Sequence, residues 1–151
     1  MKCLGMDLGT KTLGLATSDK LGMISNPYKT IKYNDIDSLV EEVLKIITEL
    51  KIEVLVLGYP KNMNNSLGFA IERTENFKTK LEAKTNLPIE LIDERLSTVE
   101  AENILIGADV SRGDRKQVID AVAASIILDT YLRKKVWEGY KKFERIRKWK
   151  N

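Results

Sequence analysis

The spacing of apolar residues changes once along this chain of 151 residues, and that change restricts the fold more than any other feature. The first part of the chain contains three short apolar segments joined by short turns. Strands joined by such turns pair antiparallel, so residues 2–7, 13–18 and 23–31 predict a three-stranded meander. Pro27 lies in the third segment and predicts an edge strand or a bulge, because proline has no amide hydrogen for the sheet.

From Ile36 onward, apolar residues at helical spacing alternate with short continuous apolar runs. This pattern predicts alternating helices and buried strands, with Asn34 or Asp35 as the first N-cap. The expected helices are 36–50, 67–84, 97–106 and from 114 or 115 to 132, and the expected strands are 54–57 and 89–92. Strand–helix–strand steps make right-handed parallel crossovers. We therefore predict an α/β fold with a five-stranded mixed sheet, an antiparallel three-strand meander plus two parallel strands, flanked by helices on both faces.

The composition is typical of one globular domain, with 43% hydrophobic and 31% charged residues. No apolar run approaches the ~20 residues that span a bilayer, and Asp7 comes too early for a signal-peptide core. These features predict a cytoplasmic protein with no membrane segment. The chain has no histidine, which excludes Ser-His-Asp and Cys-His triads and imidazole metal sites. Its one cysteine, Cys3, lies in an apolar run and is expected to be buried and inert.

Charge is distributed unevenly along the chain. Residues 133–151 carry nine basic and two acidic side chains, a net charge of +7, whereas the preceding residues carry 16 basic and 20 acidic ones. We therefore divide the chain into a domain over residues 1–132 and a basic, aromatic, helical C-terminal extension over 133–151. Aromatic residues interleaved with the basic ones suit nucleic-acid binding. The interpretation we favour is a terminal amphipathic helix that packs Trp137, Tyr140 and Phe143 on the body, and both interpretations can hold together.

Two acidic residues are notable for their neighbours. Asp7 ends the first expected strand and precedes a turn, Gly9-Thr10-Lys11, whose amides and Thr10 hydroxyl can reach phosphate. Asp120 lies in an otherwise apolar or small run of the last helix, where a carboxylate is costly unless it is paired or binds a metal. The alternatives are an Asp7 that only caps the turn and an Asp120 that faces solvent.

Basic and amide side chains occur at two further places suited to phosphate. A polar loop follows the expected strand 54–57, at the sheet edge where α/β folds bind ligands. A basic cluster lies just before and at the start of the last helix. The residues are Lys61 and Asn62 in the loop, and Arg112, Arg115 and Lys116 in the cluster. The alternatives are an ordinary polar loop and structural salt bridges.

An acidic pair, Asp93 and Glu94, leaves the last expected strand together with Arg95. Because neighbouring strand residues point to opposite faces, only one of the two acids is expected to face a site. The predicted sheet places this strand end beside that of Asp7. Three carboxylates that converge from separate elements, without histidine, suit two hard divalent cations about 3.5–4 Å apart. One ion would activate water and the other would stabilise the leaving oxygen of a phosphodiester.

Taken in order, these motifs resemble those of the Holliday junction resolvase family, also described as the pre-16S rRNA nuclease family, within the ribonuclease H-like superfamily. The resemblance covers about residues 1–132. It rests on Gly5-Met6-Asp7-Leu8-Gly9, Gly58-Tyr59-Pro60-Lys61-Asn62-Met63, Asp93-Glu94-Arg95-Leu96-Ser97-Thr98, and Arg115-Lys116 through Asp120-Ala121-Val122-Ala123-Ala124. Tyr59 departs from the family, which usually has an aliphatic residue there. The resemblance implies a ribonuclease H-like fold with Asp7, Glu94 and Asp120 as the catalytic, metal-binding triad, and it selects Glu94 over Asp93.

We therefore expect a Mg²⁺- or Mn²⁺-dependent endonuclease that hydrolyses phosphodiester bonds in structured nucleic acid. Its expected role is 5′-end processing of pre-16S rRNA, Holliday junction resolution, or both. The residues expected to hold nucleic acid are Thr10, Lys11, Lys61, Asn62, Arg95, Arg112, Arg115 and Lys116. The expected partners are structured RNA or branched DNA and the precursor of the small ribosomal subunit, and the protein is expected to be a monomer or a homodimer.

Two other functions stay open at this point. The first is a nucleic-acid-binding ribosome-assembly factor without catalytic turnover, although a pure binder gains nothing from acids that face an anion. The second is an actin-like phosphotransferase, which only Asp7-Leu8-Gly9-Thr10 suggests. Those enzymes clamp nucleotide between two such domains, and this length supplies one.

Overall fold

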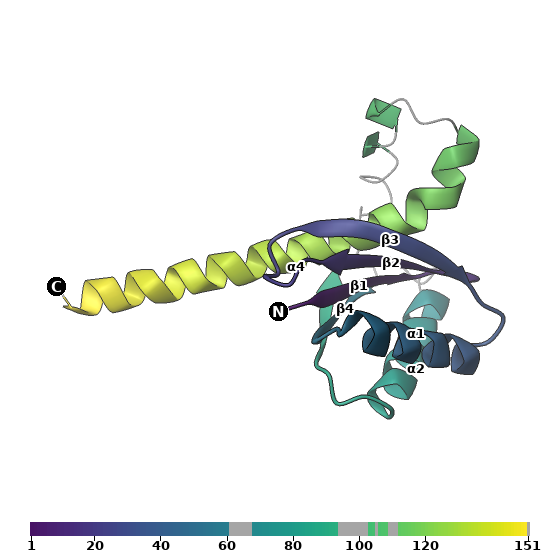
Figure 1. Ribbon diagram of the computed structural model, residues 1–151, viewed down its shortest axis with the longest axis horizontal. Helices are drawn as coiled ribbons and strands as arrows, with labels where there is room; N and C mark the ends of the chain where they lie inside the picture. Colours follow the sequence, from purple (N-terminus) through teal and green to yellow (C-terminus); the bar gives the residue numbers. More distant parts are fainter. Residues whose placement is uncertain (61–67, 94–102, 105, 109–111, 151) are drawn as a thin grey trace.

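The computed structural model describes residues 1–60, 68–93, 103–104, 106–108 and 112–150, with backbone alone for 112–117 and 150 (Figure 1). The elements are β1 (Cys3–Leu8), β2 (Thr12–Ser18), β3 (Ser25–Lys32), α1 (Ile36–Leu50), β4 (Val54–Tyr59), α2 (Gly68–Glu82), β5 (Ile89–Asp93) and α4 (Arg112–Lys150). The strands form one mixed sheet in the order β3-β2-β1-β4-β5. The predicted α/β architecture is therefore confirmed. The helix expected over 97–106 lies mostly outside the described residues.

The first three strands form the predicted antiparallel meander. β3 is an edge strand, and its pairing with β2 shifts register where Leu15 lies opposite Lys29 and Ala16 opposite Pro27. The shift leaves Tyr28 as the extra residue of a bulge. Both features predicted for a proline in this segment are therefore present.

The second half of the sheet is parallel: β4 pairs with β1, and β5 pairs with β4. The α1 helix leads into β4, and its N-cap is Asp35, whose carboxylate accepts a 2.8 Å bond from the Ser38 amide. One prediction is wrong: the ends of β1 and β5 are not neighbours, because β4 lies between them. The first crossover returns the chain to the open edge of β1, so the second crossover adds β5 outside β4. The carboxyl ends of all three strands still share one edge of the sheet.

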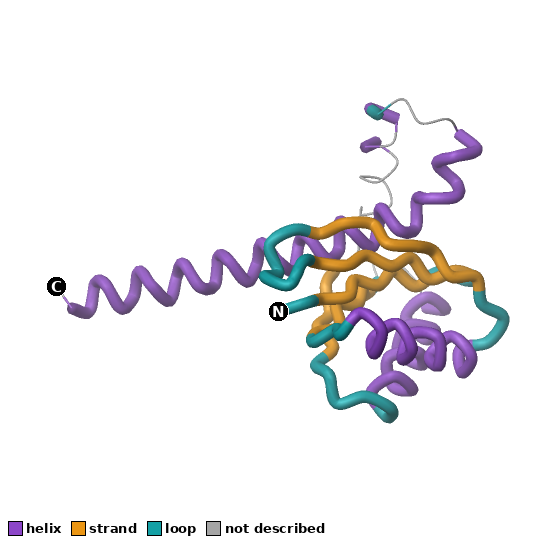
Figure 2. Tube along the Cα trace, in the orientation of Figure 1, coloured by secondary structure: helices purple, strands orange, loops and turns teal. Residues whose placement is uncertain are grey.

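Helices cover both faces of the sheet, as Figures 1 and 2 show. α1 and α2 cover one face, over a core that includes Leu4, Met6 and Leu57. α4 covers the other face, where Cys3 and Val56 belong to a second core. Burial raises the pKa of the Cys3 thiol, which disfavours the reactive thiolate, as expected for an inert cysteine. No helix in the described parts of the chain is long and apolar enough to cross a membrane.

α4 runs without interruption through residue 132 and continues to Lys150. Its last part (yellow in Figure 1) projects beyond the sheet. Trp137, Tyr140 and Phe143 are 55%, 53% and 62% exposed, so the predicted packing of these aromatic side chains on the body is wrong. At 3.6 residues per turn, Tyr140 and Phe143 fall on the side of α4 roughly opposite Ile127 and Tyr131, which are buried against the sheet, whereas Trp137 falls at the flank between the two sides. The helical character of the extension agrees with expectation, and a division of the chain at residue 132 stays a prediction.

Candidate nuclease site

Asp7 lies at the carboxyl end of β1, the central strand of the sheet. In the antiparallel pairing of β1 with β2 it stands opposite Gly14. Residues paired in this way point to the same face of a sheet. Gly14 faces α4, because a β-carbon added to it would lie 2.0 Å from the backbone oxygen of Asp120. The half-buried Asp7 carboxylate therefore shares a sheet face with Asp120.

Two glycines allow α4 to lie directly against the sheet. A β-carbon on Gly5 would lie 2.7 Å from the β-carbon of Leu128 and 3.0 Å from the carbonyl oxygen of Ala124. At Gly14 the clash would be with the α4 backbone itself. Glycine in a strand is typical of such close backbone approach. The missing side chains thus place Asp120 next to β2.

Thr12 holds the Asp120 carboxylate. Its hydroxyl donates a 2.8 Å hydrogen bond to Oδ2 of Asp120. Asp120 is half-buried, so the alternative in which it simply faces solvent is wrong. A carboxylate has about four acceptor positions, and one hydroxyl bond leaves the others available to a cation. Sequence reasoning missed Thr12, because a threonine that starts a strand has no distinguishing pattern.

Thr10 and Lys11 are exposed in the β1–β2 turn, at the same edge of the sheet. The Gly9 amide donates to the carbonyl of Thr12 at 2.8 Å. Tyr33 anchors the turn from beyond β3: its hydroxyl donates to the Gly9 carbonyl at 2.5 Å, and its amide donates to the Lys11 carbonyl at 3.0 Å. Burial raises the pKa of Tyr33, which keeps the phenol protonated as a donor. Sequence reasoning also missed this tyrosine.

Of the two adjacent acids Asp93 and Glu94, the structure describes Asp93, the last residue of β5. Ile92 belongs to the core under α4, so the next residue, Asp93, faces the side of α1 and α2. Asp93 is in register with Tyr59, whose hydroxyl donates to Glu75 of α2 at 2.6 Å. The tyrosine that departs from the family pattern therefore has a local packing role. Asp93 lies on the sheet face away from α4, and Glu94 lies outside the described residues.

The remaining predicted site residues are only partly placed. Lys61, Asn62 and Arg95 lie outside the described residues, and Arg112, Arg115 and Lys116 occupy the first two turns of α4 without described side chains. The structure therefore brings Asp7 and Asp120 to one face, with Thr10 and Lys11 at the same edge. Within the part of the chain that is described, no group of three Asp, Glu, His or Cys residues could hold a metal ion.

The donors present suit a hard divalent cation. Asp7 and Asp120 offer carboxylate oxygens, and Thr12 contributes a hydroxyl to the same cluster. The one thiol, on Cys3, is buried near the opposite end of β1. Oxygen-only sites favour ions such as magnesium and manganese over zinc or copper. The residues present therefore fit the Mg²⁺ or Mn²⁺ that the sequence leads us to expect.

Comparison with known families and proteins gives a consistent assignment. The family model described as RuvX, Holliday junction resolvase, matches residues 1–134. A Geobacillus kaustophilus (strain HTA426) protein named "Putative pre-16S rRNA nuclease" is 47% identical over 137 residues, which cover 89% of this chain and 99% of the relative. A Bacillus subtilis (strain 168) protein of the same name is 47% identical over 134 residues, covering 87% of this chain and 97% of the relative.

Solved structures agree with the fold. The structure titled "T. thermophilus RuvC in complex with Holliday junction substrate" matches with a TM-score of 0.59 at 14% identity, over 90% of this chain and 96% of that chain. A Fowlpox virus resolvase in complex with Holliday junction DNA matches with a TM-score of 0.55 at 12% identity, over 89% and 98% of the two chains. At such low identity the likeness concerns the fold alone, and it confirms the ribonuclease H-like prediction.

Proposed function

The chain belongs to the RuvX Holliday junction resolvase family, and from this membership we propose that Asp7, Glu94 and Asp120 hold the divalent metal ions of its nuclease site. The family is described as a Holliday junction resolvase and the relatives are named "Putative pre-16S rRNA nuclease", and enzymes of both descriptions hydrolyse phosphodiester bonds. The observation that carries the proposal is the pairing of Asp7 with Gly14, whose missing side chain admits Asp120 to the same face. Mg²⁺ or Mn²⁺ is the proposed ion, because the donor set is all oxygen.

Glu94 is the proposed third ligand. Asp93 is paired with Tyr59 on the opposite face of the sheet, so it is not available to this cluster. Glu94 is the other acid at the end of β5, and the family resemblance points to the same residue. We therefore assign the metal-binding role to Glu94 and none to Asp93.

The chain's own residues orient the reacting groups. Asp7, Glu94 and Asp120 would hold the divalent ions, whose chemistry would be the activation of water and the neutralisation of charge on the leaving oxygen. The Thr12 hydroxyl fixes one oxygen of Asp120 and so sets the direction of its carboxylate. Thr10 and Lys11 offer a hydroxyl and an ammonium to the phosphate. The remaining proposed phosphate contacts are Lys61, Asn62, Arg95, Arg112, Arg115 and Lys116.

The proposed substrate is structured nucleic acid, with precursor 16S rRNA favoured over four-way DNA junctions. The support is that relatives at 47% identity are named for the RNA precursor, whereas the junction-bound structures are only 12–14% identical. A non-catalytic assembly factor is the alternative, and membership of a nuclease family argues against it.

The test compares wild-type protein with Asp7→Asn on a labelled precursor rRNA and a labelled four-way DNA junction, with Mg²⁺, Mn²⁺ or EDTA. Metal-dependent cleavage should fall by roughly 10²–10³-fold in the variant, because several kcal/mol of transition-state stabilisation come from bound metal. Glu94→Gln should lose activity similarly, whereas the matched control Asp93→Asn should retain it. If folded Asp7→Asn protein cleaved at the wild-type rate, the metal assignment would be refuted. Tight binding without cleavage by the wild-type protein would favour the assembly factor.

A further inference from the structure

The end of α4 from Arg133 to Lys150, called the arm below, stands away from the rest of the molecule (Figures 1 and 2). Between residues 133 and 149 every side chain is exposed except that of Glu144, which is half-buried. The family match ends at residue 134. The arm is therefore a feature of this chain that nuclease family membership does not explain.

The sequence of α4 explains why the arm projects. Every seventh residue of a helix returns to nearly the same side, with a drift of about 20°. Ile127 is buried against the sheet, and steps of seven from it lead to Lys134, Lys141 and Lys148. The side of α4 that is apolar over the sheet therefore becomes a row of cations where the sheet ends. Arg145 falls within the same row, four residues after Lys141.

Most of the basic side chains described in the arm have no acidic partner. Three other basic side chains of this region form ion pairs along the helix: Arg133 with Asp129, Lys135 with Glu138, and Arg147 with Glu144. In the described part of the chain, no ion pair or hydrogen bond involves the side chains of Lys134, Lys142, Arg145 and Lys148. Residues 133–151 carry a net charge of +7. Uncompensated positive charge along about 21 Å of helix attracts a polyanion.

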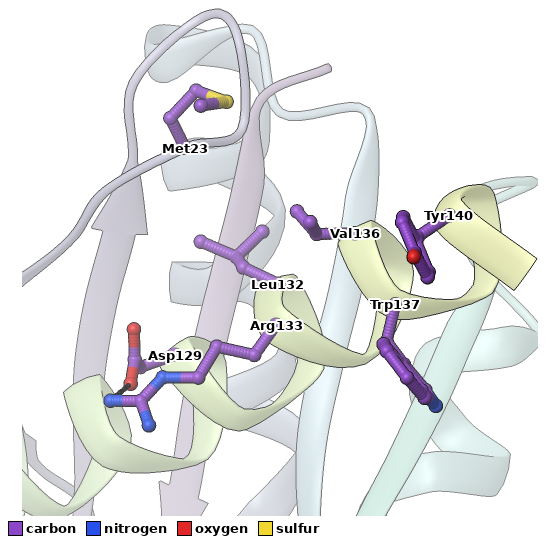
Figure 3. Close-up of a pocket in the computed structure, with 7 residues that line it drawn as sticks. All are labelled: Met23, Asp129, Leu132, Arg133, Val136, Trp137 and Tyr140. Atoms are coloured by element: carbon purple, nitrogen blue, oxygen red, sulfur yellow. Dashed lines mark ion pairs between the residues drawn. The ribbon is translucent and has the colours of Figure 1, made fainter.

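Aromatic side chains accompany the cations. Trp137 lies one helical turn from both Lys134 and Lys141, and the Lys141 ammonium is 5.3 Å from the centre of its ring. Figure 3 shows Trp137 beside Tyr140, with which it stacks at a centroid distance of 5.5 Å. Trp149 is 91% exposed. Exposed rings beside cations are the combination that stacks nucleobases while the cations contact phosphates.

We propose that the arm is a second nucleic-acid contact, in which Lys134, Lys141, Arg145 and Lys148 bind the backbone of the substrate away from the carboxylates. The inference rests on the proposed nuclease function in so far as the bound polymer is its substrate. At 1.5 Å per residue, the cations lie about 21–42 Å from Asp120 along α4. At ~3.4 Å per base pair, a duplex reaches the first of them only if it extends about 6 base pairs from the point of cleavage.

A second copy of the chain is the competing occupant of this region. An apolar groove of about 580 Å³ lies at the base of the arm, lined by Met23 of the β2–β3 turn and by Leu132, Val136, Trp137 and Tyr140 (Figure 3). The Asp129–Arg133 ion pair borders it. Pairing two arms would bring together two segments of charge +7, which repel each other. Charge complementarity therefore favours the polyanion.

The test measures binding without cleavage, by fluorescence anisotropy in EDTA with the Asp7→Asn protein. The probes are RNA hairpins with stems of about 20 and about 5 base pairs, lengths chosen on either side of the reach estimated above. The arm variant combines Lys134→Gln, Lys141→Gln, Arg145→Gln and Lys148→Gln. The control variant removes the same charge from the body through Lys2→Gln, Lys20→Gln, Lys29→Gln and Lys45→Gln.

The arm variant should bind the long hairpin at least about 10-fold more weakly, and its slope of log K against log salt should flatten by about 0.7–0.9 for each lost phosphate contact. Binding of the short hairpin should not change, and the control variant should have a much smaller effect on the long one. Equal affinities and slopes for the arm and control variants would overturn the proposal. It would also be overturned if Val136→Ser with Phe143→Ser converts a dimer to a monomer while the arm variant binds like its parent. Because no cleavage is needed, loss of the nuclease assignment would leave this measurement intact.

Discussion

Gly14→Ala tests the close approach of α4 to β2 at Gly14, the residue that lies opposite Asp7 and against the backbone of Asp120. The new β-carbon would lie 2.0 Å from the oxygen and 2.3 Å from the carbon of the Asp120 carbonyl, both backbone atoms of α4. Ordinary contacts of a β-carbon begin near 3.4 Å, so strand and helix must separate by about 1.4 Å at this point. Neither atom belongs to a flexible side chain that could rotate away. The substitution therefore moves Asp120 relative to Asp7 without changing either acid.

The expected effect has two parts. Overpacking of a close contact costs about 1–3 kcal/mol, and a backbone clash belongs at the upper end of this range. For a chain of this length each kcal/mol lowers the melting temperature by about 2–4 °C. A displacement of about 1 Å at a site can reduce the rate by about 100-fold. Gly14→Ala should therefore lose more activity at 25 °C than its stability, measured by urea unfolding, would explain.

Two other glycines provide the matched series. At Gly5 the clash is milder, 2.7 Å from a side-chain atom and 3.0 Å from a carbonyl oxygen, so Gly5→Ala should be intermediate in stability. Gly139 lies on α4, and nothing lies within 4 Å of a β-carbon added to it. Gly139→Ala should therefore stabilise the protein by about 0.5–1 kcal/mol. If Gly14→Ala were as stable and as active as Gly139→Ala, the close approach would not control the site.

Three further outcomes follow from single contacts. Thr12→Val removes the donor to Asp120 and should reduce the cleavage rate at saturating metal by about 10-fold, since a hydrogen bond to a charged group contributes about 1.5–3 kcal/mol. Thr12→Ser keeps the hydroxyl and should restore that rate. Tyr33→Phe leaves the Gly9 carbonyl without its phenol donor and should destabilise the fold by about 1 kcal/mol in urea unfolding. Burial raises the pKa of Tyr131 to about 12, above the ordinary value of 10.0, so its contribution to stability is present below pH 10 and lost as the pH rises through 10–12. Alkaline melting curves should therefore fall less steeply for Tyr131→Phe than for the wild-type protein.

Local pattern predicted the elements of this fold better than their neighbours in space. Pro27 indicated both the edge position of β3 and its bulge, and polar residues before Ile36 indicated the N-cap that Asp35 provides. The relation of β1 to β5 was wrong, because local apolar spacing does not state which edge of a sheet a crossover strand joins. That choice depends on the pairing of β4 with β1, a contact between segments about fifty residues apart.

The prediction for the arm was wrong for a different reason. Its aromatic content suggested packing on the body, but content does not tell which side of a helix a residue occupies. The angular position of each residue around the helix axis does tell this. Counted from Ile127, it places Lys134 and Lys141 on the side that faces the sheet, and Tyr140 on the side that faces away. The projection of the arm was therefore readable from the sequence, provided that the helix is continuous through residue 132. Nothing in the local pattern distinguishes such a continuous helix from two helices joined by a bend.

The sequence identified some residues of the candidate site and not others, for a similar reason. Asp120 was identifiable because a carboxylate among apolar and small residues is costly without a partner, and Asp7 because it ends a strand before a turn whose amides can reach phosphate. Thr12 was not, because its role depends on a hydrogen bond to a residue 108 positions away. What brings the acids together is the absence of side chains at Gly5 and Gly14, and glycine in a strand is equally compatible with a bulge or a bend. The separation of the two carboxylates is thus set by two missing β-carbons as much as by the acids themselves, which is why no pattern of acidic residues alone could have specified it.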